Sequence, residues 1–138
     1  MANNDTNKKT TVMTVMKDKK VMLSTVWIVA LFNYLYADFF NLSFNPEIWD
    51  VTILTEGAML GFAVLMETAI AMVLLSRVLK YRANRLTNII VGIIHTALVI
   101  WSLSGGTPIL YYRFFASIEI ACTVFIVLYA WRWREQEA

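Results

Sequence analysis

The sequence predicts an all-α membrane protein, an antiparallel bundle of four transmembrane helices joined by short loops. The 138 residues are 59% hydrophobic and have a mean hydropathy of +0.59, which is too apolar for a typical soluble domain. Four apolar runs approach the roughly 20 residues that a helix needs to cross a bilayer. Stretches such as AMVLLS and VFIVLYA are apolar on every side, whereas helices of a soluble bundle keep a polar face.

The four predicted spans follow one another, and no internal repeat or second domain separates them. They cover approximately residues 21–44, 57–78, 87–103 and 109–131. The third is the shortest, at about 17 residues, which is near the lower limit for crossing a bilayer. We therefore divide the chain into a basic N-terminal segment (1–20), a four-helix membrane domain (21–134) and a short tail (135–138).

The basic residues predict how the bundle is oriented. Eleven of the twelve Lys and Arg residues fall before the first span, between the second and third, or after the fourth: Lys8, Lys9, Lys17, Lys19, Lys20, Arg77, Lys80, Arg82, Arg85, Arg132 and Arg134. Only Arg113 falls on the other side. Because basic loops stay in the cytoplasm, we expect both termini and the second loop to be cytoplasmic.

Each span carries a polar side chain near its middle. These residues are Asn33, Glu67, His95 and Glu119. With a rise of about 1.5 Å per residue, all four lie within roughly one turn of the bilayer midplane. Ionisable groups at that depth are costly unless they have partners, so the shared depth predicts one buried polar site. The alternative is that each residue is a separate packing solution with a local partner.

We assign six further polar residues to the surroundings of this site: Asp38, Asn88, Ser102, Tyr112, Arg113 and Thr123. Asn88 and Ser102 lie seven residues before and after His95, so the three are expected to form one stripe on the third helix. Asp38 and Arg113 share a depth nearer the outer boundary. They are expected to form a salt bridge between the first and fourth helices.

Two blocks of sequence resemble a family of small four-helix bacterial membrane proteins of unknown function. The blocks are FNYLYAD, from Phe32 to Asp38, and TPILYYRFFASIEI, from Thr107 to Ile120. The similarity covers most of the chain from Leu23 to Trp133. This resemblance implies a multi-pass protein of a bacterial inner membrane, and it implies no activity.

Three kinds of function fit these residues. The first is a proton-coupled carrier of a small solute or cation, which in so small a bundle would need a homodimer to enclose a path. The second is an acid/base enzyme or a binder for an apolar or amphipathic ligand within the membrane. The third is a structural or partner subunit without chemistry of its own.

The expected partners are the lipid bilayer, a second copy of the chain, and a small-molecule or lipid-like ligand. No pattern points to nucleic acid. Glu67, His95 and Glu119 could supply three metal ligands, but the chain lacks the ExxH and HxxxH spacings of helical metal sites, so we expect neither a metal nor another cofactor.

Overall fold

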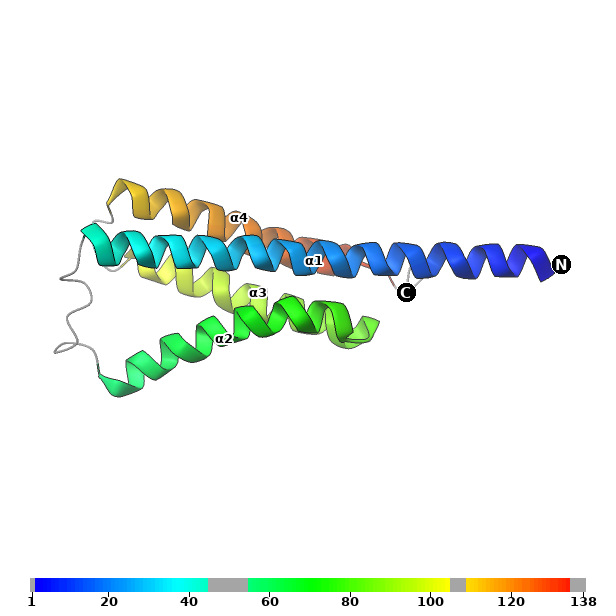
Figure 1. Ribbon diagram of the computed structural model, residues 1–138, viewed down its shortest axis with the longest axis horizontal. Helices are drawn as coiled ribbons and strands as arrows, with labels where there is room; N and C mark the ends of the chain where they lie inside the picture. The colour runs from blue at the N-terminus through cyan, green and yellow to red at the C-terminus, as the bar shows by residue number, and fades with distance from the viewer. Residues whose placement is uncertain (1, 45–54, 105–108, 135–138) are drawn as a thin grey trace.

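The computed structural model describes residues 2–44, 55–104 and 109–134, with side chains from residue 7 onward. Within these residues it contains four α-helices and no strand: α1 (Ala2–Phe44), α2 (Glu56–Val78), α3 (Tyr81–Ser104) and α4 (Leu110–Arg132). All four are long and apolar enough to cross a membrane. Successive helices run in opposite directions (Figure 1), so the predicted antiparallel four-helix bundle is confirmed.

Two helices begin earlier than the hydrophobicity predicts. Residues 2–20 of the basic segment are continuous with the first span, so that α1 is 43 residues long. At about 1.5 Å per residue it measures roughly 65 Å, about twice the thickness of a bilayer's hydrocarbon core. Its N-terminal end extends past the other helices (Figure 1). α3 begins at Tyr81 rather than near residue 87, because polar residues continue a helix readily outside the lipid.

The core is organised around one face of α1. Leu23, Trp27, Ala30, Tyr34 and Ala37 are all buried and recur every three or four residues, which places them on one side of the helix. α1 packs against both α2 and α4, and α3 packs mainly against α4. α1 and α4 therefore each pack against two neighbouring helices.

α3 and α4 approach each other closely at Gly92. A Cβ atom added there would lie 2.7 Å from Cγ2 of Val127 and 3.4 Å from the backbone oxygen of Thr123. Thr96, one turn further along α3, donates a hydrogen bond of 2.7 Å to the Thr123 hydroxyl. The missing side chain at position 92 lets these two helices meet along a close seam.

α2 is held by only its second half. It begins at Glu56, where the Thr55 hydroxyl accepts a capping hydrogen bond from the backbone nitrogen of Ala58. Every residue from Thr55 to Val64 is exposed, and the buried residues of α2 are Ala69, Met72 and Ser76. Figure 1 shows α2 diverging from α1 toward its N-terminal end.

A buried polar network fastens α2 to its neighbours near the short turn between α2 and α3. The Trp27 indole nitrogen and the Ser76 hydroxyl both donate to Asn88 Oδ1, at 2.8 and 3.2 Å. Asn88 Nδ2 donates to Asn84 Oδ1 at 2.7 Å, and Asn84 Nδ2 donates to the backbone oxygen of Ser76. Since all four side chains are fully buried, this network joins α1, α2 and α3 at a fixed register.

Candidate functional site

His95 lies at the junction of three helices, with a partner at each ring nitrogen. The Tyr34 hydroxyl oxygen on α1 is 3.2 Å from Nδ1, and the Thr68 hydroxyl oxygen on α2 is 3.0 Å from Nε2. The Trp27 ring packs edge-on against the imidazole, with 5.4 Å between ring centroids. The histidine is 2% exposed and therefore lies wholly within the bundle.

The hydrogen bonds around His95 can be assigned a direction. The Thr68 hydroxyl donates to the backbone oxygen of Leu65 at 2.7 Å, so its single hydrogen is already used. Its oxygen then accepts the hydrogen on His95 Nε2, which leaves Nδ1 free to accept from the Tyr34 hydroxyl. The imidazole in this arrangement is neutral. Each donor in this series of hydrogen bonds, from the Tyr34 hydroxyl through His95 and Thr68 to the Leu65 backbone oxygen, has an acceptor.

Glu119 on α4 is the other buried ionisable group that the sequence predicts. It is 6% exposed, and its Oε1 atom has no hydrogen-bond partner among the described residues. Asp38 and Tyr34 lie within electrostatic range of its carboxyl group. A buried carboxyl oxygen without a partner is costly in lipid, so this position calls for a proton, an ion or another ligand.

Glu67 and Asn33 do not lie with His95 and Glu119 inside the bundle. Glu67 is exposed, so its prediction as a buried site residue is wrong for the single chain. Asn33 is half-buried and its amide donates to the backbone oxygen of Val29 in its own helix, at 2.9 Å. The predicted site of four converging residues is therefore reduced to His95 and Glu119.

The two misplaced residues each lie next to a residue that does reach the site. Tyr34 follows Asn33 and Thr68 follows Glu67, and both bond to His95. One residue changes the depth along a helix by only about 1.5 Å but rotates the side chain by about 100°. The sequence did contain a signal for Tyr34 and Thr68. Both carry hydroxyl groups that can form hydrogen bonds, and both lie at nearly the same depth as Asn33 and Glu67, the residues predicted instead.

Asp38 and Arg113 do not form the predicted salt bridge, since the described residues contain no ion pair between them. Arg113 is exposed, whereas Asp38 is half-buried and faces the Glu119 region. Arg113 precedes Glu119 by six residues, which turns it about 120° away from the buried face of α4. Equal depth again did not determine the direction of the side chain.

The other residues assigned to the surroundings serve mainly to join helices. Asn88 is at the centre of the network described above. Ser102, the third member of the stripe predicted for α3, is exposed, unlike Asn88 and His95, and accepts a hydrogen bond of 2.8 Å from Tyr112. Thr123 is buried and bonds to Thr96 across the close seam. The bonds of Ser102 and Thr123 hold α3 against α4 at the level of His95 and further toward the C-terminal end of α3.

The described part of the chain contains no group of three or more His, Cys, Asp or Glu side chains placed to hold a metal ion. The conceivable set of Glu67, His95 and Glu119 does not assemble, because Glu67 is exposed and both nitrogens of His95 face hydroxyl groups.

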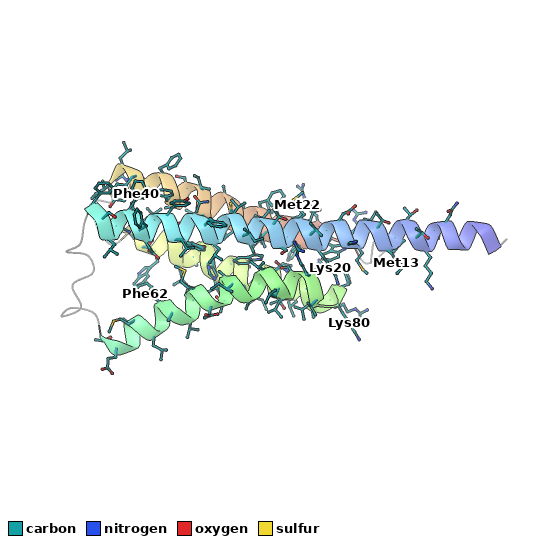
Figure 2. All side chains as sticks on the ribbon, viewed as in Figure 1. Met13, Lys20, Met22, Phe40, Phe62 and Lys80 are labelled. Atoms are coloured by element: carbon teal, nitrogen blue, oxygen red, sulfur yellow. The ribbon has the colours of Figure 1, made fainter. Side chains whose placement is uncertain are left out.

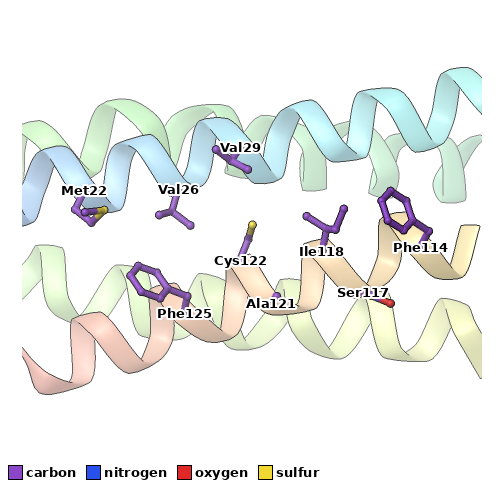
Figure 3. Close-up of a pocket in the computed structure, with 9 residues that line it drawn as sticks. All are labelled: Met22, Val26, Val29, Phe114, Ser117, Ile118, Ala121, Cys122 and Phe125. Carbon is purple, nitrogen blue, oxygen red and sulfur yellow. The ribbon is translucent and has the colours of Figure 1, made fainter.

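An apolar groove runs between α1 and α4 on the outside of the bundle (Figure 3). It has a volume of about 500 Å³. Its lining residues are Met22, Val26, Val29, Phe114, Ser117, Ile118, Ala121, Cys122 and Phe125. Cys122 lies within electrostatic range of Glu119, one turn away on the same helix. The groove therefore lies on the outer side of α4, next to the part of the helix that carries Glu119.

Comparison with protein families matches residues 11–138 to a family of unknown function, DUF6326. The chain belongs to this family. Searches of curated proteins and of solved structures gave no match. The family confirms the resemblance found in the sequence and carries no activity with it, so the function has to be argued from the site.

Proposed function

We propose that the protein is a small proton-coupled carrier of a solute or cation, in which Glu119 takes up and releases the proton. The observation that carries this proposal is the buried Glu119 Oε1 atom, which lacks a partner among the described residues. A carboxylate inside the lipid is costly without a positive charge beside it, and binding a proton or a cation removes that cost. A buried carboxylate of this kind favours the exchange of a bound proton for a bound cation.

The surrounding residues support this role by fixing the site rather than by sharing the charge. Tyr34 is anchored to His95 and lies within electrostatic range of Glu119. His95 is in turn anchored to Thr68 on α2. A movement of α2 would therefore reach the carboxyl group through two hydrogen bonds, and the exposed first half of α2 is the part best placed to move.

The distribution of basic residues supports the expected orientation. The starts of α1 and α3 and the ends of α2 and α4 lie at one end of the bundle (Figure 1), and eleven of the twelve Lys and Arg residues belong to these parts of the sequence. We infer that this end faces the cytoplasm and that the host membrane is a bacterial inner membrane. Glu119 would then exchange its proton across that membrane.

Proton coupling can be tested in everted membrane vesicles that carry an acid-inside pH gradient, reported by an acridine dye. Na⁺, K⁺ and small organic amines are added in turn. We expect one of them to dissipate the gradient with the wild-type protein and none to do so with Glu119→Gln. Glu56→Gln makes the same chemical change at an exposed helix start and should behave as wild type.

Two outcomes would contradict the carrier. In the first, Glu119→Gln responds as the wild type does. In the second, the wild-type protein, correctly inserted, responds to none of the solutes.

The groove between α1 and α4 supports a second candidate, a binder or acid/base enzyme for an apolar or amphipathic ligand. Eight of its nine lining residues are apolar or a cysteine, and its only hydroxyl, on Ser117, donates to the backbone oxygen of Arg113. A hydrocarbon tail would fit such a surface, with Glu119 beside it. Mass spectrometry of the protein purified in native lipid would identify a specifically retained molecule, which the carrier does not require.

A further inference from the structure

Glu67 occupies the middle of α2 and points away from the rest of the bundle. It lies eleven residues from each end of the helix, Glu56–Val78, so it is at the centre of a membrane span. The buried residues Ala69, Met72 and Ser76 lie on the opposite side of the helix. The carboxyl group is exposed and has no hydrogen bond or ion pair within the described residues.

This position is costly for a single chain in lipid. A carboxyl group at the midplane needs a hydrogen-bond partner even when it is neutral, because hydrocarbon provides none. The nearest end of α2 is about 16 Å away along the helix, at 1.5 Å per residue, which is too far for a glutamate side chain to reach water. Something outside the chain must therefore cover Glu67.

The residues around Glu67 form a continuous exposed seam. Leu60, Ala63, Glu67, Ile70 and Leu74 follow one another at spacings of three and four residues, and all are exposed. This is the spacing by which two helices pack along their length. Ala63, one turn before Glu67, is small enough for a second helix to approach the carboxyl group closely.

The chemistry of a carboxylic acid identifies the partner. Two neutral carboxyl groups satisfy each other, since each offers one donor and one acceptor. A second copy of this chain necessarily presents such a group at the same depth, because its charge distribution inserts it in the same orientation. Rotation about an axis along the membrane normal then brings the same residues together from both copies.

We propose that α2 is a homodimer interface, in which two parallel copies pack along Leu60, Ala63, Glu67, Ile70 and Leu74, with the two Glu67 carboxyl groups hydrogen-bonded at the centre. The charged ends of the helix do not oppose this pairing. Glu56 lies at the membrane boundary, and Arg77 Nε donates to Ser24 of its own chain at 3.0 Å. The proposal is independent of the role assigned to Glu119.

Disulfide crosslinking in native membranes tests the geometry. In a Cys122→Ser background, Ala63→Cys and Ile70→Cys should form disulfide-linked dimers on oxidation, because the seam brings these positions within the few ångströms that a disulfide needs. Phe62→Cys is the matched control. It lies one residue from Ala63, is 51% exposed, and projects from the α1 side of α2 (Figure 2), so it should remain monomeric.

The chemistry at the centre is tested by two substitutions of Glu67. Glu67→Gln keeps a donor and an acceptor and should preserve the dimer, whereas Glu67→Ala removes both and should weaken association about tenfold. Association is measured by energy transfer between labelled copies diluted in liposomes, which does not depend on any transport activity.

Three results would overturn the proposal. The first is crosslinking at Phe62→Cys that equals crosslinking at Ala63→Cys and Ile70→Cys. The second is equal association of the Gln and Ala variants. The third is exclusive crosslinking of the seam to a different protein, which would make α2 a binding surface for that protein instead.

Discussion

At the residue scale, His95 is tolerated inside the membrane because both of its ring nitrogens are satisfied. Tyr34 donates to one nitrogen and Thr68 accepts from the other. A buried imidazole without these partners would leave polar atoms unpaired in a region without water. The histidine therefore connects three helices, and its neutral form suits that role.

The assigned tautomer of His95 can be measured directly. Because the chain contains one histidine, protein labelled with ¹⁵N-histidine gives the signals of this ring alone. We expect a neutral imidazole with its hydrogen on Nε2. Thr68→Val removes the acceptor without changing the shape, so it should reduce the population of this tautomer and lower the free energy of unfolding by about 1 kcal/mol.

Thr87→Val is the control for this measurement, because the Thr87 hydroxyl donates to the backbone oxygen of Ala83 in its own helix and bonds to no other described residue. It should leave the histidine signals unchanged. A hydrogen found on Nδ1 in the wild-type protein would reverse the direction assigned to the whole chain of bonds.

At the element scale, the four helices differ greatly in how firmly they are packed. α3 and α4 meet closely at Gly92, whereas every residue of α2 from Glu56 to Val64 is exposed. The packing of α2 is therefore concentrated in its second half, where the buried network around Asn88 joins it to α1 and α3. α2 retains freedom to move or to bind a partner.

Substitution of two glycines should distinguish the close α3–α4 contact from the exposed first half of α2. Gly92→Ala forces a Cβ atom against Val127 and should lower the free energy of unfolding by about 1–3 kcal/mol, since overpacked cores must shift. Gly61→Ala on α2 meets nothing within 4 Å and should be neutral or stabilising, because alanine favours the helix by up to about 1 kcal/mol. Unfolding in mixed detergent measures both, and equal losses would contradict the packing described.

At the scale of the whole molecule, the orientation of the bundle in the membrane decides from which side protons would reach Glu119. The charge distribution predicts that both termini and the turn between α2 and α3 face the cytoplasm. In a Cys122→Ser background, Glu47→Cys and Gly106→Cys should react with an impermeant thiol reagent added to spheroplasts. Lys17→Cys and Arg82→Cys should react only after lysis, and the opposite pattern would reverse the proposed direction of exchange.

The whole molecule also shows how far depth alone can predict a site. The spacing of polar residues along four spans indicated a common level, and the structure places Tyr34, Thr68 and His95 in contact at that level. Asn33 and Glu67 were predicted in place of their neighbours. A shift of one residue along a helix changes the depth in the membrane little but turns the side chain by about 100°. The positions of polar residues in the sequence therefore predict the depth of a buried site better than they predict which side chains form it.

The sequence by itself determined that this is a four-helix membrane protein, because the length and apolar character of each span depend on local composition alone. It also indicated His95 and Glu119 as polar residues deep in their spans, and both are buried in the structure. Only the tertiary structure decided which side chains face one another. That choice depends on the rotation of each helix about its axis, which is fixed by close contacts such as Gly92 against Val127 and by the network around Asn88. The same rotation turned Glu67 outward, where a single chain offers it no partner among its described residues.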